Sequence, residues 1–263
     1  MKKKKFEKVL KDIKDVKIQG ATNIAKAALT AYYLIPTKVS KRKIFSLRPT
    51  EPLLFNVLDK AEKNSHKKIL EHFFFIKEKI NNESLKLINK KDVIFTHCHS
   101  TTVSNALIFA KKNGKKFSVL NTETRPLYQG RKTARELSKN KIKITTYVDS
   151  GMHEAIKRTD KIFLGADAIL EKGVINKIGS AIVGEIAKTH KKPVYIFADS
   201  WKFFPKNIKI EERNFEEVWK KTPKGVKIRN PSFELIPKKY VTKIVSELGV
   251  LSYNEFLRKV KKK

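Results

Sequence analysis

The feature that most constrains the fold of this chain is a regular alternation of short β-prone runs and helical stretches after residue 90. The β-prone runs are Val93–Phe95, Phe117–Leu120, Ile142–Val148, Lys161–Leu164 and Val194–Ala198. The helical stretches between them cover Thr102–Lys112, Gly130–Asn140, His153–Arg158 and Ile178–His190. Strands that alternate with helices form βαβ units and a mainly parallel sheet.

The first 90 residues have a different pattern, which predicts helices without strands. Apolar residues from Phe6 to Val16 recur at the spacing of one helix face on a basic segment. Further helices are expected over Ala21–Leu34, Leu53–Lys63 and His66–Asn89. We therefore expect a helical N-terminal domain (residues 1–90) packed on a Rossmann-like, mainly parallel α/β domain (residues 91–263), with the active site between them.

The chain carries a formal net charge of +33, from 59 Lys and Arg against 26 Asp and Glu. Such a field favours anionic partners, whether nucleic acid, phosphorylated metabolites or acidic lipid. The cations are scattered along the sequence and few of them are Arg. Dedicated nucleic-acid surfaces concentrate cations and interleave aromatic residues. Nucleic acid is therefore the less favoured partner, and a Lys-rich solvated surface explains most of the charge.

Cys98 is the only cysteine, which excludes an internal disulfide and a Cys-based zinc cage. A chain with a single cysteine fits a reducing cytoplasm best. The longest apolar stretch lies near Ala27–Ile35, well short of the about 20 residues that span a bilayer. The basic start is not followed by the apolar block of a secretory signal. We expect a cytoplasmic protein without a membrane partner.

Polar, small or ionisable residues follow each predicted strand. Because parallel strands end at one edge of a sheet, and ligands bind outside that edge, these residues are expected to meet there. They are His97–Ser100, Asn121–Glu123, Asp149–Gly151, Gly165–Asp167 and Asp199–Lys202. The sequence thus places a thiol, carboxylates and a lysine together.

Two residues of this edge are candidates for acid–base chemistry. Cys98 is either a small buried hydrophobe or a functional thiol, with a pKa lowered by the helix that begins just after it. Asp167 is either a turn cap or a general acid, with a pKa raised by desolvation. Metal binding by His97 and His99 is less favoured, because alternation at a strand end points them apart.

Three basic residues, Lys177, Arg125 and Arg48, are candidates for holding phosphate. Lys177 follows Asn176, which is expected to cap a helix N-terminus, and a helix N-terminus with an adjacent lysine is a natural phosphate site. Arg125 suits either a phosphate or an ion pair with an acid such as Glu123, and Arg48 is either a surface cation or a phosphate clamp. Neither a complete P-loop nor a Gly-x-Gly-x-x-Gly turn is present, so ATPase activity and a dinucleotide cofactor are not indicated.

In its longer motifs the chain resembles the archaeal ribose-1,5-bisphosphate isomerase family. That family shares a superfamily with methylthioribose-1-phosphate isomerase and with the regulatory subunits of translation initiation factor 2B. The match runs from about Ile18 to Val250. It is carried by residues 92–100 (DVIFTHCHS), 122–137 (TETRPLYQGRKTAREL), 160–169 (DKIFLGADAI), 173–182 (GVINKIGSAI) and 230–241 (NPSFELIPKKYV).

This resemblance implies an aldose–ketose isomerase that converts α-ribose 1,5-bisphosphate into ribulose 1,5-bisphosphate without cofactor or metal. It assigns the proton acceptor to Cys98 and the proton donor to Asp167. It also implies a homo-oligomer, dimer or hexamer, activation by AMP, and a place in AMP breakdown. The implied substrate contacts are Gln19, Gly20, Ala21, Thr22, Arg48, Ser100, Thr101, Thr102, Asn176, Lys177 and Lys202, with Gln129 added from the methylthioribose-phosphate branch.

One departure from the family pattern bears on the substrate. The family turn reads Arg-Gly-Ala-Gly, whereas this chain has Gln19-Gly20-Ala21-Thr22. Loss of a charged hydrogen bond worth roughly 1.5–3 kcal/mol would weaken affinity about ten- to a hundredfold or more. Either a lysine replaces the Arg, or the substrate differs, or catalysis is lost.

Two alternatives therefore remain open beside the bisphosphate isomerase. One is a protein-binding regulatory subunit, which would not need the Cys98–Asp167 pair. The other is methylthioribose-1-phosphate isomerase, which needs an apolar slot in place of a second phosphate site. The many cations favour the bisphosphate.

Overall fold

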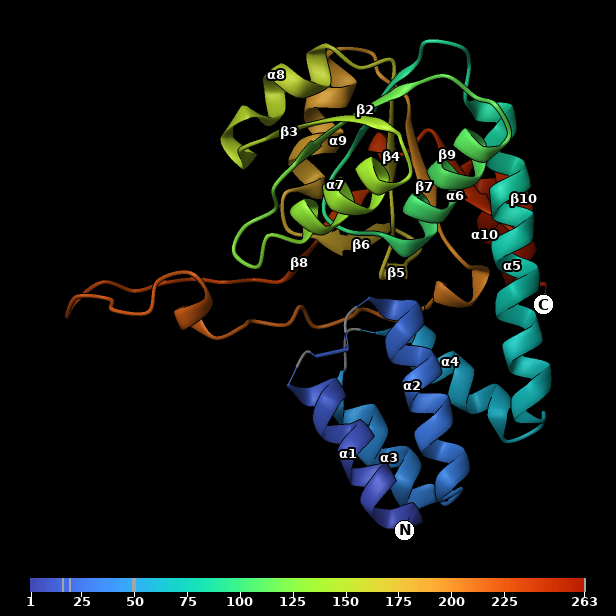
Figure 1. Cartoon of the computed structure of the whole chain (residues 1–263). Coiled ribbons are helices and arrows are strands. Elements are labelled where there is room, and N and C mark those ends of the chain that lie inside the picture. Colours follow the sequence, from blue (N-terminus) through green and yellow to red (C-terminus); the bar gives the residue numbers. More distant parts are fainter. Residues whose placement is uncertain (16, 19, 49–50, 263) are drawn as a thin grey trace.

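The computed structural model describes residues 1–15, 17–18, 20–48 and 51–262. Its N-terminal part is a group of four helices that lies apart from the sheet in Figure 1. These helices are α1 (Lys2–Lys14), α2 (Ala21–Leu34), α3 (Lys38–Leu47) and α4 (Pro52–Ala61). Phe6, Leu10 and Ile13 bury the apolar face of α1 against a core dominated by α2 and α4. The side chain of Thr37 accepts a hydrogen bond from the Ser40 amide and so begins α3.

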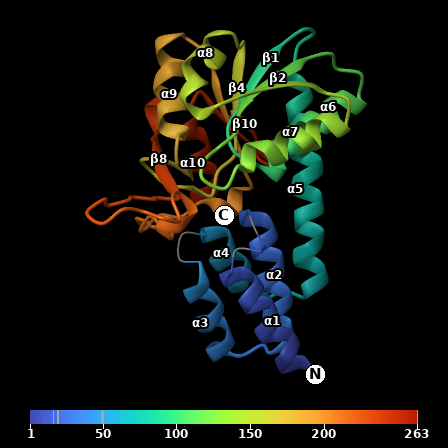
Figure 2. The same ribbon diagram turned by 60° about the vertical axis from the view of Figure 1, so that its left-hand side comes forward.

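The long helix α5 (His66–Leu87) belongs to both halves of the molecule (Figure 2). Ile69 and Phe73, near its start, pack into the core of the N-terminal helices. Ile76 and Ile80, one and two turns later, pack into the core beneath the sheet. The domain boundary expected at residue 90 stays a prediction, because α5 connects the two cores before that point.

The second half is built on a seven-stranded sheet with the strand order β10-β9-β7-β4-β1-β2-β3. Every pairing in it is parallel except β9 with β10. The expected α/β fold class is confirmed. The strands are β1 (Val93–Thr96), β2 (Ser118–Thr122), β3 (Lys143–Tyr147), β4 (Lys161–Leu164), β7 (Val194–Phe197), β9 (Lys243–Ser246) and β10 (Gly249–Leu251).

Helices cover both faces of this sheet. On one face α8 (Met152–Lys157), α9 (Ser180–Thr189) and α10 (Tyr253–Lys261) contribute to one core. On the other face α5, α6 (Thr101–Lys112) and α7 (Gln129–Lys139) contribute to another. Because both faces are buried, the central strand β4 is buried along its whole length. Its apolar residues Ile162, Phe163 and Leu164 follow one another instead of alternating with polar residues.

A second sheet and an extended arm were not anticipated. The antiparallel strands β5 (Ala168–Ile169), β6 (Gly173–Lys177) and β8 (Phe233–Pro237) form a three-stranded sheet. Asn176 and Lys177 lie on β6, and the N-cap of α9 is Gly179. The expectation that Asn176 is the N-cap of that helix is therefore wrong.

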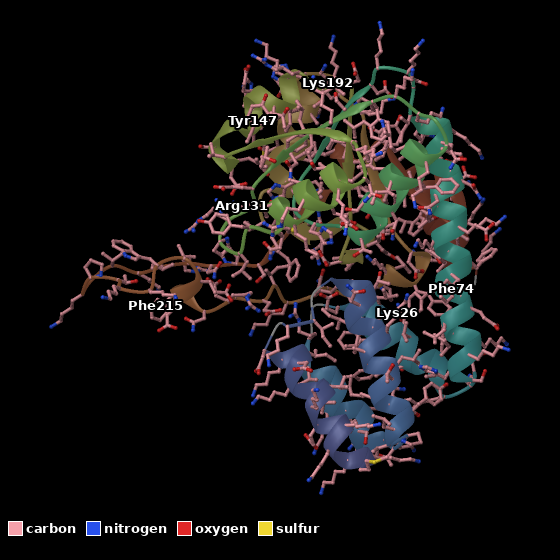
Figure 3. All side chains as sticks on the ribbon, in the orientation of Figure 1. Lys26, Phe74, Arg131, Tyr147, Lys192 and Phe215 are labelled. Atoms are coloured by element: carbon pink, nitrogen blue, oxygen red, sulfur yellow. The ribbon has the colours of Figure 1, made fainter. Side chains whose placement is uncertain are left out.

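The chain between the η2 turn (Ser200–Lys202) and β8 forms the arm, residues 205–231. It extends far from the rest of the molecule, and Phe215 lies partway along it (Figure 3). At its base Arg213 pairs with Glu211 and Glu217.

No helix among the described residues combines the length and hydrophobicity needed to cross a bilayer.

Asn56 on α4 holds the two halves together at η2. Its amide Nδ2 donates hydrogen bonds to the carbonyl oxygens of Trp201 (2.6 Å) and Phe203 (3.1 Å). We expect Asn56→Ala to lower the free energy of unfolding by about 1–3 kcal/mol, because two partly buried acceptors lose their donor. Urea unfolding measures the loss. Asn64→Ala is the matched control, because the exposed hydrogen bond of the Asn64 amide goes to the Lys60 carbonyl of its own segment. Equal stability of the two variants would contradict the prediction.

Candidate active site

One pocket lies where the ends of β1, β4 and β7 face the N-terminal helices. The chain leaves β1 toward β2 and β3 on one side, and returns through β4, β7 and β9 on the other. The edge between β1 and β4 is therefore the topological switch point, where α/β sheets bind ligands. The described members of the predicted site all line this pocket: Gly20, Ala21, Thr22, Arg48, Cys98, Ser100, Thr101, Thr102, Gln129, Asp167, Asn176, Lys177 and Lys202. Gln19 lies outside the described residues, and the role of each residue stays a prediction.

Cys98 follows β1 directly and has a left-handed backbone conformation, with φ of 65°. Two threonines fix this backbone. The Cys98 amide donates to Thr124 Oγ1 (3.0 Å), and its carbonyl accepts from Thr133 Oγ1 (2.9 Å). The turn is thereby tied to two neighbouring segments before α6 begins at Thr101, with Ser100 as its N-cap.

Burial raises the pKa of the Cys98 thiol to about 11, and the Asp167 charge adds to this, while Lys177 acts in the opposite direction. The expectation that the following helix lowers the thiol pKa is wrong for this pocket. A helix N-terminus contributes only a partial charge, whereas loss of water penalises the whole thiolate charge.

Asp167 follows β4, and its amide donates to the Ile175 carbonyl on β6 (2.9 Å). It is the N-cap of none of the described helices. Burial raises the pKa of its carboxyl, although Lys202, Lys177 and Arg48 oppose that rise. The protonated form of Asp167 is therefore favoured relative to a solvated carboxyl, as a proton donor requires.

Three cations approach this carboxyl from different elements. Lys202 is 5% exposed, and its Nζ donates to the Ala166 carbonyl (2.5 Å). Lys177 comes from β6, with its ammonium 5.1 Å from the centre of the Phe233 ring. Arg48 is 7% exposed, and its Nε and Nη1 have no hydrogen-bond partner among the described residues. Buried guanidinium donors without a partner suit a phosphate or carboxylate ligand.

Glu51 also lines this pocket, is 1% exposed and was not predicted from the sequence as a site residue. Its Oε1 lies 3.7 Å from Arg48 Nη2, and its Oε2 has no partner among the described residues. Burial raises the pKa of Glu51 to about 8, and the Asp167 charge contributes, against the effects of Arg48 and Lys202. The sequence signal that could have identified Glu51 was its position three residues after Arg48, a candidate phosphate clamp.

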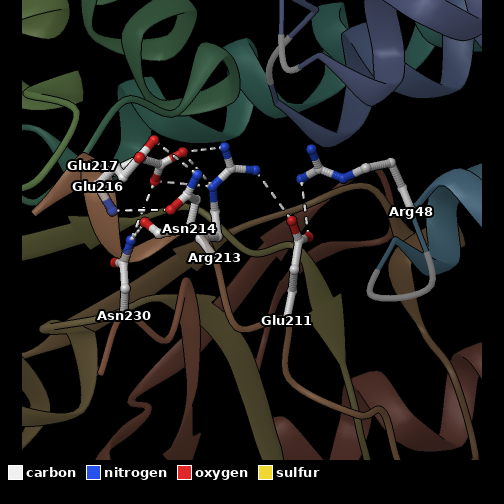
Figure 4. Close-up of polar contacts among 7 residues, drawn as sticks. All are labelled: Arg48, Glu211, Arg213, Asn214, Glu216, Glu217 and Asn230. Atoms are coloured by element: carbon white, nitrogen blue, oxygen red, sulfur yellow. Dashed lines mark hydrogen bonds and ion pairs between the residues drawn. The ribbon is translucent and has the colours of Figure 1, made fainter. Parts of the chain in front are cut away.

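A second residue missed from sequence, Glu211 at the base of the arm, approaches Arg48 from the other side. Its Oε2 lies 3.5 Å from Arg48 Nη2, and its Oε1 lies 3.2 Å from Arg213 Nη1 (Figure 4). Arg213 also lines the pocket. The arm therefore contributes a chain of alternating charges that ends at Arg48.

The two histidines beside Cys98 support the walls of the pocket. The two nitrogens of His97 contact Thr122 Oγ1 (2.6 Å) and the Ile178 carbonyl (2.9 Å). His99 Nδ1 contacts Thr133 Oγ1 (3.0 Å). Burial lowers the pKa of both rings, that of His99 to about 4. The two rings thus connect the end of β1 to three different segments.

The ion pair between Arg125 and Glu123 that was considered from sequence is not formed. Its guanidinium donates to the Tyr128 hydroxyl (2.6 Å) and to the Val218 carbonyl on the arm (3.1 Å). Glu123 instead pairs with Arg131. Arg125 is therefore a contact between the body and the arm.

The reactivity of Cys98 tests these electrostatics directly, because it is the only thiol in the chain. We expect its alkylation by iodoacetamide to accelerate about tenfold per pH unit up to a pKa of about 11. Asp167→Asn should shift this profile to lower pH by removing a carboxylate, and Lys177→Met should shift it to higher pH by removing a cation. A profile centred near the ordinary thiol value of about 8.5 would contradict the assignment.

Known proteins similar to this chain indicate its family. Residues 37–253 match the Initiation factor 2 subunit family. A ribose 1,5-bisphosphate isomerase from Thermococcus kodakarensis is 32% identical, over 94% of this chain and 91% of the relative. A putative methylthioribose-1-phosphate isomerase from Methanocaldococcus jannaschii is 33% identical, over 81% and 74%.

Among solved structures, translation initiation factor eIF-2B from Pyrococcus horikoshii OT3 superposes with a TM-score of 0.84 at 26% identity, covering 94% of this chain and 96% of that one. The match in sequence thus extends over most of the chain, and the match in structure includes both the helical part and the sheet. The chain belongs to the Initiation factor 2 subunit family.

Proposed function

We propose that this protein is an isomerase of sugar phosphates, with α-ribose 1,5-bisphosphate as substrate and ribulose 1,5-bisphosphate as product. The observation that carries the proposal is that Cys98 and Asp167 line one pocket together with the buried cations Arg48 and Lys202. Relatives from four archaea named as ribose 1,5-bisphosphate isomerases support the choice of substrate.

The chemistry begins with ring opening, because a closed ribose phosphate has no free carbonyl. Asp167 donates a proton to the ring oxygen as the bond between that oxygen and C1 breaks. Burial raises the pKa of this carboxyl, which favours its proton-carrying form relative to a solvated aspartate. The charge that develops at C1 is stabilised by the attached phosphate oxygen.

Proton transfer from C2 then forms the enol. The Cys98 thiolate removes the C2 proton, and the electron pair of that bond forms the C1–C2 double bond. The Cys98 thiol next returns its proton to C1, while the Asp167 carboxylate takes the proton of the C2 hydroxyl. The C2 ketone results, and both side chains regain their starting states. Positioning and exclusion of water supply the remaining acceleration.

The thiolate is the less favoured form of Cys98 in this pocket, since burial raises its pKa to about 11. Lys177 acts to lower this pKa, and protonation of Asp167 removes one of the charges that raise it. The acid form of Asp167 and the thiolate form of Cys98 therefore support each other.

The two alternatives differ in what they require of this pocket. A regulatory subunit needs a protein-binding surface and no buried acid–base pair. A methylthioribose-1-phosphate isomerase needs one phosphate site and an apolar wall, and Leu127 and Phe233 supply apolar side chains to the lining. A homo-oligomeric state, activation by AMP and a cytoplasmic location stay predictions from the resemblance and the composition.

A product assay decides between these functions. Purified protein is given ribose 1,5-bisphosphate and, separately, methylthioribose 1-phosphate. We expect turnover of the bisphosphate, and a fall in kcat of about a hundredfold to ten-thousandfold in Cys98→Ser and in Asp167→Asn, because each loses one proton-transfer group. Ser104→Ala, on α6 outside the pocket lining, is the control. Folded wild-type protein that turns over neither sugar would favour the regulatory function, and undiminished turnover in both variants would remove the catalytic assignment.

A further inference from the structure

The immediate surroundings of Arg48 are unusual for a phosphate site, because two carboxylates already lie beside its guanidinium. Glu51 Oε1 and Glu211 Oε2 lie 3.7 Å and 3.5 Å from the same atom, Nη2. Neither distance is a hydrogen bond, so both contacts are purely charge–charge. The other two guanidinium nitrogens, Nε and Nη1, are buried and have no partner among the described residues. One side of Arg48 is thus occupied by carboxylates while the other is open to a ligand.

Glu51 is the more important of the two carboxylates because it is enclosed. Its side chain is 1% exposed, whereas that of Glu211 is 21% exposed. Its free Oε2 is buried in the wall of the same pocket as the free nitrogens of Arg48. An anionic ligand that reaches Arg48 therefore has to approach this carboxyl group with little water between them to screen the charges.

We propose that Glu51 controls phosphate binding at Arg48. In its neutral form the Glu51 carboxylic acid leaves the Arg48 guanidinium to the ligand and donates a hydrogen bond to the ligand. In its ionised form the Glu51 carboxylate repels the ligand. This inference rests on the proposed function, since it assigns the phosphate of the sugar to Arg48.

The groups that face Glu51 determine the pH at which this change occurs. They are Arg48 on its own segment, Asp167 after β4, Lys202 on η2 and Glu211 on the arm. The two basic groups favour the carboxylate, whereas burial and the two acidic groups favour the carboxylic acid. With a pKa of about 8, Glu51 is protonated at neutral pH and loses its proton in mildly alkaline solution. Anion binding is therefore strong below that pKa and is lost as the pH rises through it.

Sulfate is the appropriate first probe, because it stays fully ionised over the whole range and its own titration does not contribute. Its dissociation constant is measured by calorimetry between about pH 6.5 and 9.5 at constant ionic strength. We expect the wild-type constant to rise by about tenfold per pH unit above a pKa of about 8, the slope for release of one proton. Arg48→Met gives the background from the many surface lysines.

Glu51→Gln isolates the residue, since it keeps the size and polarity of the side chain and cannot ionise. We expect this variant to bind sulfate with the same constant at both ends of the range, and about tenfold more tightly than wild type near pH 9. Glu211→Gln is the matched control: it also removes a carboxylate near Arg48, but leaves Glu51 in place, and so it should retain the wild-type slope. A pH slope that persists in Glu51→Gln, or one that disappears in Glu211→Gln, overturns the proposal.

The same series with ribose 1,5-bisphosphate, in a Cys98→Ser background that prevents turnover, separates this inference from the proposed function. A Glu51-dependent slope for sulfate without any binding of the sugar supports the control of Arg48 and removes the proposed substrate. Binding and turnover of the sugar with an affinity that stays constant across the range supports the function and overturns the control by Glu51. Because the wild-type slope is measured without any variant, the test does not depend on how Glu51→Gln folds.

Discussion

Burial of charge between the helical half and the sheet is the constraint on which the rest of the site depends. Arg48 and Glu51 enter the pocket from the N-terminal half, and Lys202 enters from the sheet. All three are almost completely removed from water. Desolvation of this kind penalises every charged form, and the pKa values of Asp167, Glu51 and Cys98 are all raised with burial as the largest cause. Acid–base chemistry in the pocket follows from this environment more than from any single contact.

The general architecture could be predicted from the sequence because its signals are local. The alternation after residue 90 corresponds to the strands β1, β2, β3, β4 and β7, and the helices between them lie close to the expected ranges. The polar residues after those strands meet at one edge, since parallel strands bring their carboxyl ends together. Cys98, Asp167 and Lys202 could be placed in one site by that rule alone.

What could not be predicted depends on contacts between distant segments. The strand β5 has only two residues, and β8 pairs with β6 across about 60 residues, so no local pattern marks the three strands as a sheet. The pKa of Cys98 was expected to fall because the helix after it is visible in the sequence, whereas the enclosure that raises it is tertiary. Glu51 looks like an ordinary residue at the start of a helix until its burial beside Arg48 is known.

The helix α5 has a consequence for the way the molecule responds to stress. One end of it belongs to the core of the N-terminal helices and the other end to the core beneath the sheet. Melting of either half would leave half of this helix with its apolar face in water. The two halves are therefore expected to lose their structure together, in a single cooperative transition, and to behave as one folding unit although their architectures differ.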